Sequence, residues 1–157
     1  MKSRLRFGVM LLAFALAAMA AASVSAEHPD LTGTWKLNVT KSDFDRLSGL
    51  ISKALKIEHS EPKLKVSSTV VDQLGEHGES YAFTIDGKTN TNTMNGFATE
   101  TSSIWDGDEI LFDVNRGPNW GYKERWSLSS DGKTLTIKRH TILTRGETNE
   151  AFVFDKR

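Results

Sequence analysis

Residues 121–139 read GYKERWSLSSDGKTLTIKR, two stretches of alternating apolar and polar side chains on either side of an Asp-Gly pair. The apolar side chains fall at every second position or nearly so: Tyr122, Trp126, Leu128, Leu135 and Ile137. A period of two indicates half-buried β-strands, with one face in the core and one in water. Asp-Gly favours a tight hairpin, because glycine accepts the positive φ that the turn needs. The stretch therefore predicts an antiparallel β-hairpin.

The same pattern continues through most of the chain. Turn signals fall between alternating runs near residues 60–62, 86–88, 106–108, 130–132 and 145–146. They predict about ten strands, near 31–39, 54–59, 63–73, 79–86, 89–94, 97–105, 109–115, 121–129, 133–143 and 147–155. The segment 89–94 is polar on both faces and is equally compatible with a loop.

One stretch departs from the period of two. Within residues 42–53, Leu47, Leu50 and Ile51 have the i, i+3, i+4 spacing of a helix face. Ser42 or Asp43 would serve as its N-cap. The spacing predicts one or two short helical turns after the first strand.

Successive hairpins produce a meander, whose two edge strands need protection from pairing with other chains. Closure into a barrel removes both edges, whereas a sandwich of two sheets usually needs longer crossing connections. The only long connection is 40–53. We therefore expect an all-β fold, an antiparallel up-and-down barrel of 8–10 strands with a short helical segment after strand one.

The first 26 residues have the composition of a signal peptide. Lys2, Arg4 and Arg6 precede an alanine-rich apolar run, and Val24-Ser25-Ala26 is a small-residue cleavage pattern. We expect a 1–26 signal peptide and a 27–157 barrel domain, exported to the periplasm or the medium without membrane insertion after cleavage. The remaining 17 Lys and Arg against 20 Asp and Glu form no basic stripe, which argues against a nucleic-acid partner.

Gly33-Thr34-Trp35 lies on the first expected strand of this meander. Together with 31–44, 56–66, 102–112 and 124–139, it makes the chain resemble the calycins, and more closely the small exported bacterial proteins called lipocalin-like. The resemblance implies that Trp35 packs across one barrel end and that Gly33 allows close backbone approach there. The expected helical turns are similar to the lid of fatty-acid-binding proteins. Those proteins hold a carboxylate with an Arg-x-Tyr near the C-terminus, where this chain reads Glu150-Ala151-Phe152-Val153-Phe154.

The resemblance implies a non-catalytic carrier of one apolar or amphipathic small molecule. Six aromatic residues are the candidate ligand contacts, and at alternating spacing they are equally core residues: Phe83, Trp105, Phe112, Trp120, Tyr122 and Trp126. Trp120 lies in a Gly- and Pro-rich rim loop, where it would contact a ligand or fold back over the barrel end. The alternative is a filled barrel that holds an envelope protein or a polysaccharide on its outer face or rim loops.

An enzyme of the isomerase or cyclase kind ranks third, because it would need a polar residue facing inward and the pattern identifies none. Arg125 is expected to face outward. There is no Gly-x-Ser-x-Gly turn and no cysteine nucleophile. The four histidines, His28, His59, His77 and His140, lack the spacing of a zinc site. We expect no metal and no cofactor.

Overall fold

A computed structural model describes residues 27–157 apart from 45–48 and 95. It contains ten β-strands, and all ten expected strands are confirmed, including the polar segment at β5. The strands are β1 (Gly33–Leu37), β2 (Ser52–Ser60), β3 (Lys63–Asp72), β4 (Gly75–Thr84), β5 (Asn90–Met94), β6 (Phe97–Asp106), β7 (Glu109–Asn115), β8 (Trp120–Leu128), β9 (Thr134–Leu143) and β10 (Gly146–Lys156).

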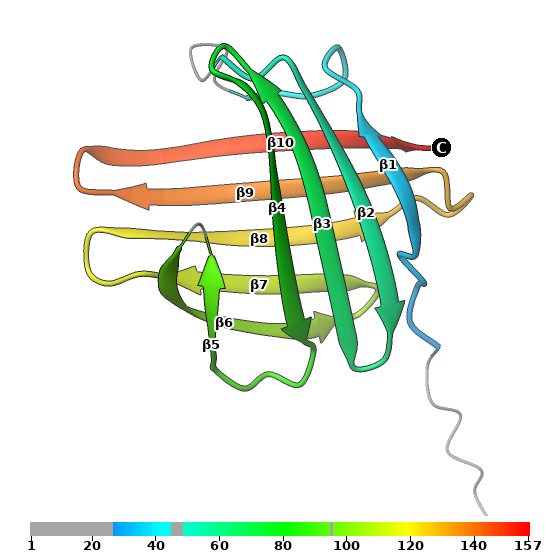
Figure 1. Ribbon diagram of the computed structural model, residues 1–157. Helices are drawn as coiled ribbons and strands as arrows, with labels where there is room; N and C mark the ends of the chain where they lie inside the picture. The colour runs from blue at the N-terminus through cyan, green and yellow to red at the C-terminus, as the bar shows by residue number, and fades with distance from the viewer. Residues whose placement is uncertain (1–26, 45–48, 95) are drawn as a thin grey trace, which may run out of the picture.

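The ten strands form one antiparallel sheet in the order β4-β3-β2-β1-β10-β9-β8-β7-β6-β5. Figure 1 shows how the sheet curls, with β1–β4 in one layer that runs across a second layer of β6–β10. Turns that follow odd-numbered strands lie at one end, which we call the mouth. Turns that follow even-numbered strands lie at the other end, which we call the base.

Closure of the barrel is not complete, contrary to the expectation that both edges would be removed. β4 and β5 share no ladder. An isolated parallel bridge between Ile85 and Ser103 and a hydrogen bond from Gly87 N to Ser103 O (2.8 Å) join the segment after β4 to β6 near the base. The polar β5 pairs only with β6, so its weak apolar pattern reflects an edge strand.

The helical segment expected within 42–53 is not found. No helix occurs among the described residues, and Leu47 lies outside them. Asp43 instead forms an antiparallel bridge with Ala151 of β10, and β2 already begins at Ser52. None of the described segments forms a helix of the length and apolarity needed to cross a bilayer.

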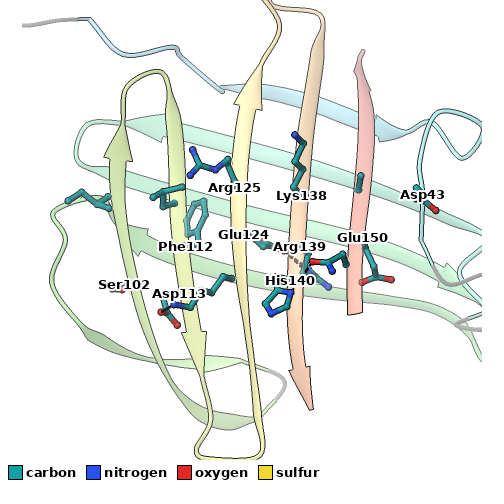
Figure 2. Close-up of a pocket in the computed structure, with 15 residues that line it drawn as sticks. Asp43, Ser102, Phe112, Asp113, Glu124, Arg125, Lys138, Arg139, His140 and Glu150 are labelled. Carbon is teal, nitrogen blue, oxygen red and sulfur yellow. Dashed lines mark hydrogen bonds and ion pairs between the residues drawn. The ribbon is translucent and has the colours of Figure 1, made fainter. Parts of the chain in front are cut away.

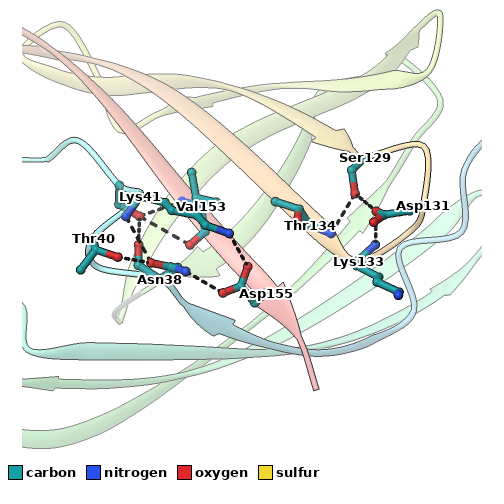
Figure 3. A network of polar contacts seen from close by, with 10 residues as sticks. Asn38, Thr40, Lys41, Ser129, Asp131, Lys133, Thr134, Val153 and Asp155 are labelled. Carbon is teal, nitrogen blue, oxygen red and sulfur yellow. Dashed lines mark hydrogen bonds and ion pairs between the residues drawn. The ribbon is translucent and has the colours of Figure 1, made fainter.

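The seam between β1 and β10 is short. Only three residue pairs are in register, from Trp35–Lys156 to Leu37–Phe154. Side chains extend the seam. Asn38 Nδ2 donates to Asp155 Oδ2 at 2.7 Å (Figure 3). Val153 N donates to Ser42 Oγ at 2.9 Å. The segment after β1 is thereby fastened along β10.

The base is packed with apolar side chains. Trp35 is fully buried there, and its indole Nε1 donates to Leu31 O at 3.0 Å. Lys156 Nζ lies 5.1 Å from the centre of the indole ring. Gly33 has φ +153°, and a Cβ at this position would lie 2.8 Å from Lys156 Cε. A side chain at residue 33 would therefore displace the lysine that covers Trp35.

Replacing Trp35 tests how far the fold depends on this packing. Trp35→Ala should lower the free energy of unfolding by about 3–5 kcal/mol, because it leaves a large cavity in the base. Trp35→Phe keeps most of the ring volume and should cost much less. Urea unfolding of both variants against the unchanged protein measures the difference, and equal small losses would show that the base does not depend on the indole.

Candidate binding site in the barrel lumen

The mouth half of the barrel is hollow. A cavity of about 250 Å³ lies between the layers and opens toward the mouth. Its apolar wall includes Leu55, Val66, Phe83, Trp126, Ile137 and Phe154. Its polar lining consists of five charged residues, Lys53, Glu79, Arg116, Glu124 and Arg139, together with Ser68, Tyr81 and Tyr122. The lumen is therefore apolar toward the middle of the barrel and charged toward the mouth.

An ion pair lies inside this lumen. Glu124 and Arg139 are direct neighbours across β8 and β9. Arg139 NH2 and Nε lie 2.6 and 2.7 Å from Glu124 Oε1, and Trp126 Nε1 donates to Oε2 at 2.7 Å. Both carboxylate oxygens thus have partners, as a buried charge requires. The Arg139 guanidinium also lies over the Tyr122 ring, 4.6 Å from its centre.

The surroundings of Arg139 and Tyr122 shift the pKa of both side chains. Burial acts to lower the pKa of Arg139, but the charge of Glu124 and its hydrogen bond outweigh burial and hold the pKa above its ordinary value. Burial, and after it the charge of Glu124, raises the pKa of the Tyr122 hydroxyl well above its ordinary value. Arg139 therefore stays charged and Tyr122 stays neutral.

Lys53 differs from its neighbours. It lines the lumen from the start of β2, and its amine makes no ion pair or hydrogen bond with any residue that the structure describes, although the charges of Glu124, Glu79 and Glu150 act on it. Burial lowers the pKa of the Lys53 amine, and the positive charge of Arg139 lowers it further. An unpaired cation thus faces a partly apolar cavity, where an anion would find a ready counter-charge.

A second cation, Arg116, lies at the mouth of the barrel. Arg116 Nε donates to Thr99 Oγ1 (3.0 Å), and its NH2 donates to Met94 O (2.8 Å). Its guanidinium lies 4.2 Å from the centre of the Trp120 ring and 5.1 Å from that of Phe97. Trp120 is consequently folded back against Arg116, where it lines the lumen.

The structure does not bring the six aromatic candidate ligand contacts together in one site. Phe83, Trp120, Tyr122 and Trp126 line the lumen. Phe112 is a core residue between Phe83 and Trp126, with both ring centres 4.9 Å away, and it does not reach the lumen cavity. Ligand contact by the four lining residues stays a prediction.

Trp105 lies at the base, away from the lumen. Its Nε1 donates to Glu61 Oε1 at 2.7 Å, and its ring is stacked on His28 with 4.2 Å between centres. Gly33 and Trp35 lie at the same end. The candidate contacts are therefore divided between the two ends of the barrel.

The inward ion pair of Glu124 and Arg139 was not predicted from the sequence. Continuing the alternation from Tyr122 to Trp126 places Glu124 inward, and continuing it from Leu135 and Ile137 places Arg139 inward. The pattern thus contained the signal for inward polar residues that the sequence-based interpretation did not name. Arg125 lies in register with Leu111 and Lys138 on the other face of the sheet, as expected. Among the described residues, no three His, Cys, Asp or Glu side chains come together as a metal site would need.

No protein-family model matches the chain, and no curated protein matches its sequence. Solved structures do match its fold. A "REP1-NXSQ fatty acid transporter" is 13% identical, with a TM-score of 0.61 over 82% of this chain and 96% of the other. A secretory abundant heat-soluble protein from Ramazzottius varieornatus is 13% identical, with a TM-score of 0.62 over 80% and 94%.

A zebrafish ileal bile-acid-binding protein, solved with cholic acid, is 14% identical, with a TM-score of 0.58 over 80% and 98%. Each likeness spans nearly the whole of the matched protein. The chain therefore shares the nearly closed ten-stranded barrel fold of fatty-acid-binding proteins.

Proposed function

We propose that the protein is a non-catalytic carrier that binds one small amphipathic molecule in its lumen. The observation that carries the proposal is Lys53, an unpaired amine in the charged part of a cavity whose other wall is apolar. The apolar part of the ligand lies against Phe83, Trp126 and Val66. Its polar head lies toward the mouth.

The head is an anion. The lumen lining contains three cations, Lys53, Arg116 and Arg139, against two carboxylates, Glu79 and Glu124. A third carboxylate, Glu150, is in register with Arg139 and its charge acts on Lys53. Since Glu124 is already satisfied by Arg139 and Trp126, the Lys53 amine is the group that a bound carboxylate or phosphate would meet. An anion beside Lys53 also removes the cost of keeping that amine charged and unpaired.

The lumen limits the size of the ligand. Its volume of about 250 Å³ lies just below the roughly 300–1,000 Å³ usual for small-molecule sites. A ligand of modest size is therefore favoured, and a longer chain would extend through the mouth. The structural neighbours named for fatty acids and bile acids support the class of ligand.

The small lumen also supports the second candidate, a barrel that holds no ligand inside and works through its outer surface. The two functions make different demands on Lys53. A carrier needs it for the head group, whereas a scaffold has no use for an unpaired amine in its interior.

We further propose that the carrier acts after export, with residues 1–26 removed and Glu27 as the first residue. The composition of the first 26 residues supports this. The bacterial origin suggested by the resemblance belongs to the same proposal. Mass spectrometry of the protein recovered from periplasm and medium tests the cleavage site.

Binding of decanoate tests the carrier directly. We expect decanoate to change the tryptophan fluorescence and to raise the melting temperature, since a ligand that binds only the folded state stabilises it. Lys53→Met should weaken binding about tenfold, the loss expected for one charge-assisted hydrogen bond. Lys56→Met is the matched control, because Lys56 is exposed on the same strand and pairs with Glu58 outside the barrel.

Decylamine, which has the same tail and a cationic head, should bind more weakly than decanoate. Equal binding of both compounds, or an unchanged affinity in Lys53→Met, would contradict the assigned head position. No binding of any compound would favour the scaffold.

The lowered pKa of Lys53 predicts a pH dependence of stability in the ligand-free protein. The unfolded amine is protonated below its ordinary pKa of 10.5, whereas the folded protein holds a proton there less tightly. The unchanged protein therefore gains stability from this residue as pH rises from the lowered folded pKa toward 10.5. Lys53→Met lacks this gain.

The melting temperature of Lys53→Met should thus exceed that of the unchanged protein at pH 7, and the difference should shrink as pH approaches 10.5. Comparing the two proteins at each pH cancels the titration of all other groups. A difference that stays constant with pH would show that Lys53 is not destabilised by burial.

A further inference from the structure

A second hollow, larger than the lumen cavity, lies outside the barrel. A groove of about 630 Å³ crosses the outer face of β6–β10, on the opposite side of this layer from the lumen (Figure 2). Glu124 and Arg139, which Figure 2 also draws, belong to the lumen side. The next residues, Arg125 and Lys138, belong to the groove, because alternate residues of a strand point to opposite faces.

The groove follows the strand register. One row of directly paired residues runs across the layer: Ile104, Leu111, Arg125, Lys138, Ala151 and Asp43. A second, parallel row is Ser102, Asp113, Lys123, His140 and Asn149. With strands about 4.8 Å apart, the first row is roughly 24 Å long, and the rows are about 7 Å apart. These dimensions suit one linear molecule lying across the strands.

Lys138 lies among basic residues on the outer face of β8 and β9. On the outer face Lys138 has eight neighbours. They are residues 123, 125 and 127 on β8, residues 136 and 140 on β9, and residues 149, 151 and 153 on β10. None of the eight is acidic, and three are basic: Lys123, Arg125 and His140. Arg125 is its direct cross-strand partner, a placement of like charges that is unfavourable in a sheet.

The acidic partners of these three basic residues lie on the outer sides of the cluster. Arg125 pairs with Asp106 (3.1 Å) and with Glu109, and Lys123 pairs with Asp113 (3.2 Å). His140 lies 3.3 Å from Glu147. The Lys138 amine makes no ion pair or hydrogen bond within the part of the chain that the structure describes. This amine is therefore open to an anion from outside.

An apolar surface continues the same row. Leu111 is next to Arg125, and Ile104 follows with 52% of its surface exposed. The other large apolar side chains that are exposed in the described chain lie near the mouth: Ile51, Leu74, Phe97, Ile142 and Leu143. Ile104 is thus an isolated exposed hydrophobe, and it lies in line with the cationic centre.

We propose that this groove is a second binding site, for an amphipathic anion. The carboxylate or phosphate of the ligand lies against Lys138 and Arg125, and its alkyl chain runs over Leu111 and Ile104. A bound anion gives the Lys138 amine a counter-charge, and the alkyl chain covers the exposed isoleucine. The site is independent of the lumen and of the function proposed for it.

Methyl NMR of the purified protein, with labelled isoleucine, separates the two sites. Ile104 reports on the groove, whereas Ile137 lines the lumen. Decyl phosphate, kept below its micelle-forming concentration, should shift the Ile104 methyl resonance in a saturable way. Lys138→Gln should weaken this titration on the order of 5-fold, the effect of one partly exposed ion pair.

Lys65→Gln is the matched control, because Lys65 is equally exposed on the outer face of β3 but far from the groove in the sheet order. It should leave the Ile104 titration unchanged. Ile104→Ser should weaken binding of decyl phosphate, measured by calorimetry, without changing the weak binding of inorganic phosphate.

Three further results would overturn the proposal. Decanol binding as tightly as decyl phosphate would show that the cations are not used. Inorganic phosphate competing as well as decyl phosphate would assign the site to a free anion without an apolar tail. Displacement of decyl phosphate by a lower concentration of a poly-glutamate peptide would assign the groove to an acidic protein partner.

Discussion

The pairing of β1 with β10 is the interaction on which the rest of the structure depends. It joins the first strand to the last through three registered pairs, and it converts a twisted sheet into a barrel. Without it, the inward faces of β1–β4 and β6–β10 would have no common interior to fill. The bonds of Asn38 to Asp155 and of Val153 to Ser42 continue the seam beyond the ladder. The interior exists because this short seam holds.

The interior of the barrel has two parts, an apolar part at the base and a part with paired charges toward the mouth. At the base, Trp35, Leu64 and Leu135 exclude water completely. Toward the mouth, Glu124 and Arg139 satisfy each other across β8 and β9. A buried charge is costly unless it is paired, and Glu124 and Arg139 line the hollow half of the barrel as such a pair. The barrel is thus solid at one end and hollow at the other.

The sequence predicted the strands well because alternation and Asp-Gly turns are local signals. The edge position of β5 and the gap beside β4 depend on how far the sheet curls, which no local pattern contains. Leu50 and Ile51 lie in no helix, whereas Leu47 is outside the described residues. Asp43 bridges to Ala151, a contact between residues more than a hundred positions apart that no local spacing indicates. In the candidate site, the alternation could have placed Glu124 and Arg139 inward. That they neutralise each other follows only from the register between β8 and β9.

Strands β8 and β9 carry charged side chains on both faces of the sheet. Glu124 and Arg139 face the lumen as a neutral pair, whereas the next residue on β8, Arg125, and the preceding one on β9, Lys138, meet as two cations outside. Folding requires the inner pairing, since an unpaired buried charge is costly, so this pairing alone says little about binding. Folding does not require an unpaired Lys53 inside or an unneutralised Lys138 outside. These two lysines are therefore the groups whose positions a bound anion explains and the fold does not.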